Sequence, residues 1–333
     1  MIPMGVPLLP PAERLLPYLK RIDESRWYTN GGPLVCEYEE RMAQLFCGYV
    51  CATSSGTSGL TAALVALDDP FDDMSVPSWT FAATVNAVKA AGFEPDFMDV
   101  DELTWQAPAY VTTAPFGAPV TDSECVVDAA AAFDAYSLGL GKIGKMPVVI
   151  STHATKCFST GEGGLVLSTD KDLIQRVREI VNHGLDDDRH IQRAGINGKM
   201  SEYHAAVGLA ELDHWAWKRS KWLDLKRKYV TVFEDLVHTT PLSSLSWVGP
   251  TFAVRLVGRD GDEVRAKLQE KGIASRKIWG DGVHKFFAYD NVERGELPVT
   301  ERLAREVVFL PYSIDISDKD LDHVFTTMRE IVG

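Results

Sequence analysis

The first fifty residues contain two stretches of helical periodicity separated by a turn. Leucine and isoleucine side chains recur at helical spacing over residues 11–26, and Tyr38 and Met42 share one face of a second periodic stretch over residues 34–46. Between them, the sequence WYTNGGP at 27–33 is rich in the Asn and Gly residues of turns. The chain is therefore expected to begin with two amphipathic helices joined by a loop.

Short apolar runs alternate with helical segments between residues 48 and 180. This alternation predicts an α/β domain built around a mostly parallel sheet. Strands are expected at 47–53, 74–77, within 92–101, and at 109–113, 125–127, 148–151 and 165–168, with helices at 58–67, 81–91 and 171–182.

One crossover in this region is short. About 11 residues, 114–124, separate two predicted strands, which is close to the minimum length for a parallel return. This segment has room for a single helical turn at most.

The remainder of the chain has a different pattern. Residues 183–200 are polar and Gly-rich, as in a loop, and a long helix is predicted at 201–238. We predict a large domain over 1–219 and a smaller α+β domain over 220–333. Within the smaller domain a strand is expected at 251–258, and helices at 260–273, near 300–306 and from 318 onward.

Composition narrows the class of protein. The 333 residues are 45% hydrophobic and carry a formal charge of −13, which disfavours binding to nucleic acid or to an anionic membrane. No apolar run reaches the roughly 18 residues of a membrane span, and the first residues lack the basic start of a signal peptide. Five cysteines without a CxxC pair argue against a disulfide framework or a metal site and for the cytoplasm.

Three motifs carry candidate chemistry. SSGTSG at 54–59 lies between a strand and a helix, where hydroxyls and backbone N–H groups can bind phosphate or merely cap the helix. Asp128 follows an apolar strand, where it can contact a ligand or cap the next helix. Lys156 lies among small polar residues and can be a nucleophile or a surface lysine. A phosphate cradle, a carboxylate and a reactive amine together match the needs of pyridoxal 5'-phosphate (PLP).

The chain resembles the DegT/DnrJ/EryC1/StrS family of PLP-dependent sugar aminotransferases over nearly its whole length. The blocks SSGTSGLTAALVAL, STHATKCFSTGEGG and GINGKMSE, in that order, carry the resemblance. It implies the aspartate-aminotransferase-like type I fold, an α/β class with a mostly parallel seven-stranded sheet and a smaller α+β C-terminal domain.

The resemblance also implies roles for single residues. Lys156 matches the lysine that bonds to the cofactor, and Asp128 matches the partner of its ring nitrogen. Thr57, Ser58 and Ser151 match residues that contact its phosphate.

The resemblance also assigns expected roles to residues outside the phosphate and lysine motifs. Phe81 matches the ring that stacks on the cofactor, whereas Trp79 is expected in the core. Asn197 matches the residue that reaches the neighbouring subunit's cofactor, which implies a homodimer with shared active sites. His183 resembles a position near the sugar-nucleotide phosphates, and His284 is a candidate at the substrate mouth.

The implied reaction moves an amino group from an amino acid, with glutamate the expected donor, to a nucleotide-linked keto-sugar in amino-deoxysugar biosynthesis. Two alternatives stay open: a PLP-dependent sugar dehydratase, against which Lys156 argues because such relatives carry His there, and a non-catalytic regulatory or binding protein. The second is favoured by Ala131, which stands where the family has Gln or His. The short crossover at 114–124 is a further departure from the family pattern.

Overall fold

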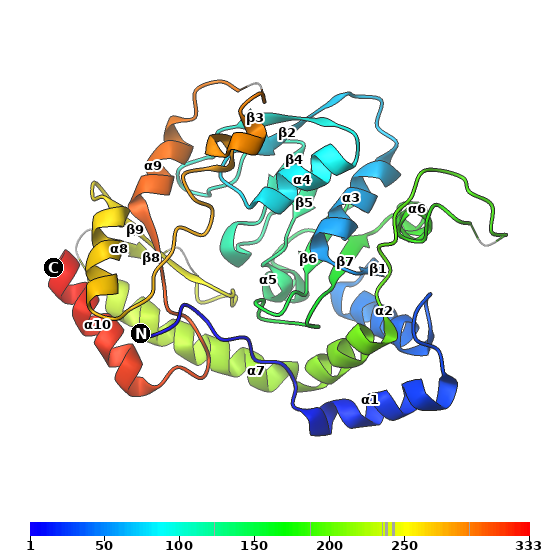
Figure 1. Ribbon diagram of the computed structural model, residues 1–333, viewed down its shortest axis with the longest axis horizontal. Coiled ribbons are helices and arrows are strands. Elements are labelled where there is room, and N and C mark those ends of the chain that lie inside the picture. Colours follow the sequence, from blue (N-terminus) through cyan, green and yellow to red (C-terminus); the bar gives the residue numbers. More distant parts are fainter. Residues whose placement is uncertain (123, 187, 235, 237–238, 242–243, 293) are drawn as a thin grey trace.

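Strands from one half of the chain form a central sheet in the computed structural model, which describes all residues except 123, 187, 235, 237–238, 242–243 and 293 (Figure 1). Five strands are hydrogen-bonded in the order β1-β7-β6-β5-β4, and β2 pairs with β3 in a separate parallel ladder beside β4. Only β7 runs antiparallel to its neighbours in the five-stranded ladder. The seven strands are β1 (Tyr49–Thr53), β2 (Asp73–Pro77), β3 (Glu94–Met98), β4 (Val111–Thr113), β5 (Val126–Asp128), β6 (Val148–Ser151) and β7 (Gly164–Ser168).

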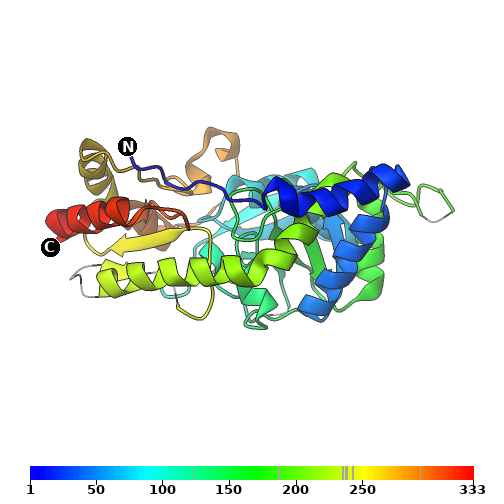
Figure 2. The same ribbon diagram turned by 90° about the horizontal axis from the view of Figure 1, so that it is seen from below.

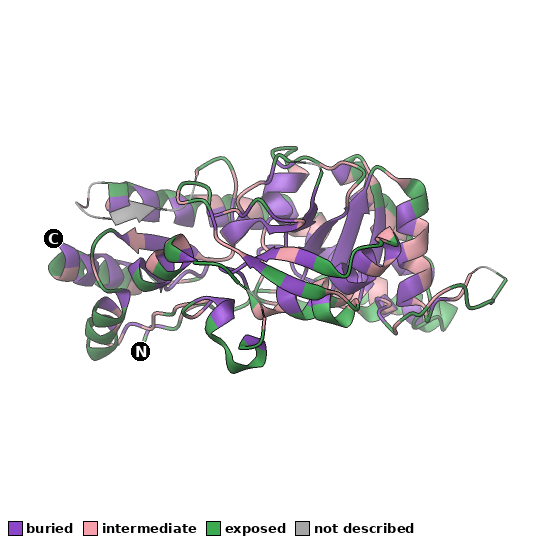
Figure 3. Cartoon of the chain, turned by 90° about the horizontal axis from the view of Figure 1, so that it is seen from above, coloured by how far each residue is buried: buried purple, intermediate pink, exposed green. Residues whose placement is uncertain are grey.

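Helices cover both faces of this sheet, which explains why its strands are buried at nearly every position. On β7, Leu165 and Leu167 enter one core and Val166 enters the other. Figure 3 shows the strands buried from both sides. Helices α3 (Gly56–Leu67), α4 (Ala82–Ala90) and α6 (Lys171–Val181) line one face, and α2 (Pro33–Phe46), α5 (Phe133–Ser137) and α7 (Glu202–Glu234) line the other.

The long helix α7 connects the sheet to the C-terminal region (Figure 2). It is continuous across residues 219 and 220, so the predicted domain boundary lies inside one helix. Helix α1 (Ala12–Ser25) packs on α7 and buries Ile22, whereas Leu16 is half exposed. The predicted end of the long helix falls on residues outside the described set.

The C-terminal region has its own antiparallel sheet, in the order β10-β9-β8. The N-terminal segment lies against the C-terminal region but outside this sheet, since Ile2 forms an isolated bridge with Ile273 and the Met4 carbonyl accepts the Tyr312 N–H at 2.7 Å. Its elements are β8 (Thr239–Pro241), β9 (Phe252–Leu256), α8 (Gly261–Glu270), two short 3-10 helices, η2 (Val283–Lys285) and η3 (Phe287–Tyr289), α9 (Pro298–Glu306), β10 (Val307–Leu310) and α10 (Asp318–Val332).

The crossover between β4 and β5 contains one 3-10 turn, η1 (Pro115–Gly117), as its length predicted. Phe116 adopts a left-handed backbone (φ 52°) and stacks on Trp279 with ring centroids 4.2 Å apart. Trp79 and Trp105 meet the same ring edge-on. An aromatic cluster thus joins the crossover to the C-terminal region.

No helix within the described residues combines the length and apolar character that a bilayer span requires.

Candidate active site

The predicted site residues converge where β1, β5 and β6 end. Asp128 and Ser151 are the last residues of β5 and β6, and β1 leads into the 54–59 motif. Lys156 lies in the loop between β6 and β7. Ligands of α/β proteins bind at this edge of the sheet.

The 54–59 motif forms the start of α3. Ser55 caps the helix by accepting the Ser58 N–H at 3.0 Å, and the Ser58 hydroxyl lies 3.1 Å from the Ser55 N–H. Thr57 is exposed, and its hydroxyl has no protein partner among the described residues. Thr57 is therefore the free side chain of the predicted pair, and Ser58 builds the cap. Phosphate binding by both residues stays a prediction.

Two glycines bring this helix start close to its neighbours. A Cβ on Gly56 would lie 2.9 Å from the Ser151 Cβ, and one on Gly164 would lie 2.7 Å from the Gly56 nitrogen. Only glycine fits both positions without displacing backbone. The structure therefore brings Ser151 and the 54–59 motif together, around backbone N–H groups suited to a phosphate.

Asp128 is 8% exposed and its two carboxylate oxygens have separate donors. The Thr84 hydroxyl donates to Oδ2 at 2.6 Å, and the Ala130 N–H donates to Oδ1 at 3.1 Å. Burial raises the pKa of Asp128, while these hydrogen bonds and the charge of Lys156 act in the opposite direction.

Lys156 is half-buried, and its backbone N–H donates to the His153 carbonyl at 2.8 Å. Burial lowers the pKa of its amine, and the carboxylate of Asp128 opposes that shift. A lysine with a lowered pKa is more often neutral, as a nucleophile or base must be. Asp128 and Lys156 therefore interact electrostatically within one site.

The two aromatic residues of the PSWTF segment have opposite settings. Phe81 precedes α4 and is 58% exposed, whereas Trp79 is 2% exposed within the aromatic cluster. The expectation that Trp79 belongs to the core is confirmed. Phe81 therefore leaves its ring exposed at the start of α4, where stacking on a cofactor stays a prediction.

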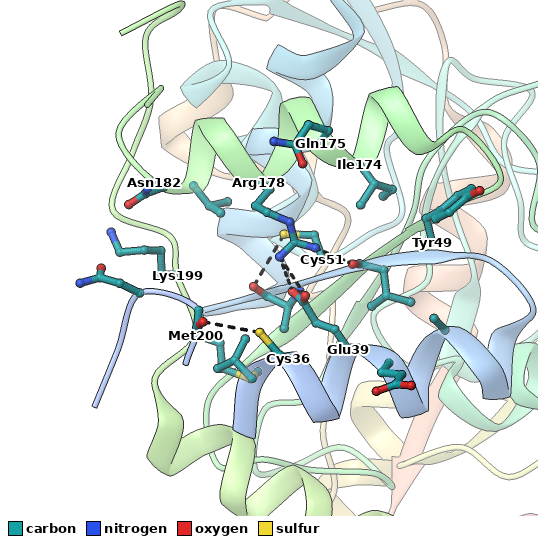
Figure 4. Close-up of a pocket in the computed structure, with 18 of the residues that line it drawn as sticks. Cys36, Glu39, Tyr49, Cys51, Ile174, Gln175, Arg178, Asn182, Lys199 and Met200 are labelled. Carbon is teal, nitrogen blue, oxygen red and sulfur yellow. Dashed lines mark hydrogen bonds and ion pairs between the residues drawn. The ribbon is translucent and has the colours of Figure 1, made fainter. Parts of the chain in front are cut away.

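Asn197 lies on the surface, where its Oδ1 accepts a hydrogen bond from the Lys199 amine at 2.9 Å. The adjacent Gly198 carbonyl accepts the Ser54 N–H at 2.7 Å, so this segment borders the 54–59 motif of its own chain. Next to it is a cavity of about 610 Å³ containing the ion pair of Arg178 and Glu39 (Figure 4). Of the predicted site residues, none lines this cavity.

The two histidine candidates lie in contrasting positions. His183 is exposed after α6, with a left-handed backbone (φ 66°). His284 is 1% exposed, and its Nε2 lies 3.7 Å from a carboxylate oxygen of Glu301. Burial lowers the pKa of His284. A buried ring gives no support to a substrate role for His284, and both roles stay predictions.

Sequence reasoning missed three residues of the site, Thr80, Thr84 and Thr113. Their hydroxyls form a buried series that ends on Asp128. The four-residue spacing of Thr80 and Thr84 at a helix start was the only available signal, because their contact with Asp128 spans 44 residues of sequence.

Ala131, the departure from the family pattern, faces the short crossover. A Cβ on Gly117 would lie 3.0 Å from the Ala131 carbonyl oxygen, and Gly249 approaches the Phe116 carbonyl from the other side. Close backbone contact therefore occupies this side of the site. Among the described residues, no group of three or more His, Cys, Asp or Glu side chains could hold a metal ion.

The fold and this arrangement of carboxylate, lysine and helix start define a PLP-dependent enzyme of type I fold. The model of the DegT/DnrJ/EryC1/StrS aminotransferase family matches residues 12–112 and 121–329, and the chain belongs to this family. The internal gap in this match, residues 113–120, lies at the short crossover. The predictions of family, fold class and cofactor are confirmed.

Individual relatives are similar over nearly their full length. A dTDP-4-amino-4,6-dideoxy-D-glucose transaminase of Shigella dysenteriae is 27% identical, covering 98% of this chain and 97% of its own. A GDP-perosamine synthase of Escherichia coli O157:H7 is 26% identical, and the match covers 99% of this chain and 98% of the synthase.

Solved structures of aminotransferases are also similar to this chain over nearly its whole length. A putative PLP-dependent aminotransferase of Bacillus cereus ATCC 10987 has a TM-score of 0.92 at 26% identity, covering 98% of this chain and 99% of its own. DesI, solved in the presence of its TDP-sugar product, has a TM-score of 0.85 at 29% identity, and the match covers 99% of this chain and 93% of DesI.

Proposed function

We propose that this chain transfers an amino group from glutamate to a keto-sugar carried on a nucleotide, with PLP as cofactor. The observation that carries the proposal is the convergence of a buried carboxylate, a half-buried lysine and an open helix start at one edge of the sheet. The names of the relatives, a dTDP-sugar transaminase and a GDP-perosamine synthase, support a sugar nucleotide as the acceptor.

The residues fit the cofactor. The start of α3, with Thr57 and the two close glycines, would hold the phosphate, and Phe81 would cover one face of the ring. When bound at this edge, PLP supplies an electron sink that stabilises negative charge on the substrate carbon.

Lys156 would hold the cofactor through its side-chain amine, and the free amine would accept and return a proton at its Nζ. Its lowered pKa favours the neutral amine that can accept this proton as a general base. Asp128 would accept a hydrogen bond from the ring nitrogen and would hold the proton there. In a buried site this pairing stabilises the developing charge without reorganisation of solvent.

Ala131 favours a second candidate, a binding protein that kept the fold and lost turnover. The family's Gln or His would hydrogen-bond the cofactor at this position, and an alanine cannot. Retention of Lys156 supports the enzyme instead, and it argues equally against the dehydratase.

We further propose a homodimer in which Asn197 reaches the partner's cofactor phosphate, a larger domain over 1–219 and a smaller one over 220–333, and a cytoplasmic location. The exposed amide of Asn197 supports the dimer, and five free thiols support a reducing compartment. Mixing Lys156→Ala with Asn197→Ala subunits tests the shared site, because one site of the heterodimer would then carry neither lesion. Exchange without any recovery of activity would contradict it.

The function itself is tested with purified protein, PLP, glutamate and a panel of dTDP- and GDP-linked keto-sugars. Mass spectrometry of the sugar nucleotide should detect replacement of the ketone by an amine, and Lys156→Ala serves as the control. If the protein binds PLP and no amino sugar forms with any acceptor, the binding-protein candidate gains support.

A further inference from the structure

Three threonine hydroxyls connect Asp128 to the end of β4. Thr84 Oγ1 lies 2.6 Å from Asp128 Oδ2, Thr80 Oγ1 lies 2.8 Å from Thr84 Oγ1, and Thr113 Oγ1 lies 3.1 Å from Thr80 Oγ1. Thr80 and Thr84 are fully buried, and Thr113 is 6% exposed. We call this series the hydroxyl relay.

The relay has one possible direction when Asp128 is ionised. A carboxylate only accepts hydrogen bonds, so Thr84 donates its single hydrogen to Asp128. Thr84 can then only accept from Thr80, and Thr80 in turn accepts from Thr113. The three O–H dipoles therefore point toward the carboxylate, and a chain of aligned bonds strengthens each member.

The relay joins two other parts of the site. Thr80 and Thr84 flank Phe81, so the segment that presents the open ring also fixes the carboxylate. Thr113 is the last residue of β4, immediately before the short crossover. Among the described side chains, the hydrogen-bond donor to Asp128 is Thr84, the first member of the relay.

We propose that Thr84, Thr80 and Thr113 are positioning residues that keep Asp128 ionised and aim its free lone pairs at the cofactor ring nitrogen. This inference rests on the proposed function, in that it requires PLP at this edge. Burial alone would favour the neutral acid, which cannot hold a proton on the ring. The relay supplies the opposing interaction.

The test measures the dissociation constant of PLP across the neutral pH range for the holoenzyme and four valine variants. Valine matches the size of threonine and removes only the hydroxyl. Thr84→Val should weaken PLP binding about 10- to 100-fold, the effect of a lost charge-assisted hydrogen bond. Thr80→Val and Thr113→Val should have progressively smaller effects.

The pH profile separates positioning from folding. Without the relay the pKa of Asp128 rises, so PLP binding should be lost at a higher pH than in the wild type. Thr112→Val is the matched control, because Thr112 is a buried neighbour on β4 whose hydroxyl donates to the Ala107 carbonyl at 3.0 Å. Thr112→Val should alter stability without moving the pH profile of PLP binding. Thr84→Ser keeps a hydroxyl and should therefore have the pH profile of the wild type.

The outcomes are distinct. The inference is overturned if Thr84→Val binds PLP within about twofold of the wild-type affinity and its pH profile equals that of Thr112→Val. The relay would then be a structural feature only. Wild-type protein that bound no PLP would overturn the proposed function together with it. No sugar substrate enters the assay, so the result is independent of acceptor specificity.

Discussion

The loop that carries Lys156 and the crossover that precedes Asp128 lie on two sides of one site and are held in different ways. The lysine loop is fixed by polar groups: the hydroxyls of Thr152 and Thr160 lie 2.6 Å apart, and the Ser159 N–H donates to buried Glu211 at 3.3 Å. The crossover is fixed by the stacked ring of Phe116 and by close glycines.

This difference teaches which part of the site follows the family and which part is particular to this chain. The lysine loop matches the family model, and residues 113–120 do not. The chemistry is accordingly expected to depend on the polar side, and the crossover to contribute mainly stability.

Replacement of the lysine should have the largest effect. Lys156→Ala removes the group that bonds the cofactor and moves the proton, so amino transfer should fall below detection. The circular dichroism spectrum should be unchanged, because this half-buried side chain contributes little to the core. Normal turnover by the variant would exclude Lys156 from the mechanism.

Asp128→Asn should come next, since it keeps the shape and removes the charge. Turnover should fall on the order of 10³-fold, because the ion pair with the ring nitrogen lies in a site of low dielectric constant. Steady-state kinetics at saturating PLP gives the measurement. A variant within about threefold of the wild type would show that the charge of Asp128 has no role in turnover.

The buried ion pair behind the lysine loop offers a test of the polar side. Lys218 is 3% exposed, contacts Glu211 and donates to the Leu8 carbonyl at 2.6 Å. Lys218→Met leaves Glu211 unpaired and should cost about 3–5 kcal/mol of unfolding free energy. Burial already raises the pKa of Glu211, and loss of the lysine raises it further.

The pH dependence of this loss has a definite sign. A carboxyl whose pKa is raised in the folded state stabilises the fold at low pH and loses that contribution as pH rises through the folded pKa. Lys218→Met should therefore be less destabilised in mildly acidic urea titrations than at neutral pH. An equal loss at both pH values would show that Glu211 keeps its charge.

The smallest effect is expected on the crossover side. Phe116→Ala should cost about 2 kcal/mol, less than for a fully buried ring, and should leave PLP affinity unchanged. Phe71, which is 64% exposed, provides the control, and Phe71→Ala should change stability by less than about 0.5 kcal/mol. Loss of PLP binding by Phe116→Ala without loss of stability would contradict the expectation that the crossover contributes mainly stability.

The sequence predicted the elements better than the contacts between them. Apolar runs located the five strands of the central sheet and the two strands of the β2-β3 ladder, and helix periodicity located every described α-helix except the short α5, because these signals are local. Strand β8 and the two 3-10 helices, η2 and η3, were missed since they carry no such period, and the apolar run of β10 was not assigned to a strand. Residue 187, inside the predicted polar loop, and residue 123, inside the crossover, lie outside the described residues.

The site was predictable where a local motif carried it. Asp128 follows from its position at the end of a strand, and the 54–59 motif follows from its place before a helix. The hydroxyl relay and the contact of Glu211 with Ser159 join residues 33 to 52 positions apart, so only the folded chain reveals them. The burial of His284 was not predictable for the same reason, because it depends on neighbours distant in the sequence, and its substrate role stays a prediction.

The visible absorption spectrum of the holoenzyme during titration with glutamate tests the central claim most directly. The account predicts a visible band from cofactor bonded to Lys156, loss of that band on adding glutamate, and its return on adding a nucleotide-linked keto-sugar. In Lys156→Ala the band should be absent from the start. A band that persists in this variant, or that glutamate leaves unchanged in the wild type, would contradict the account.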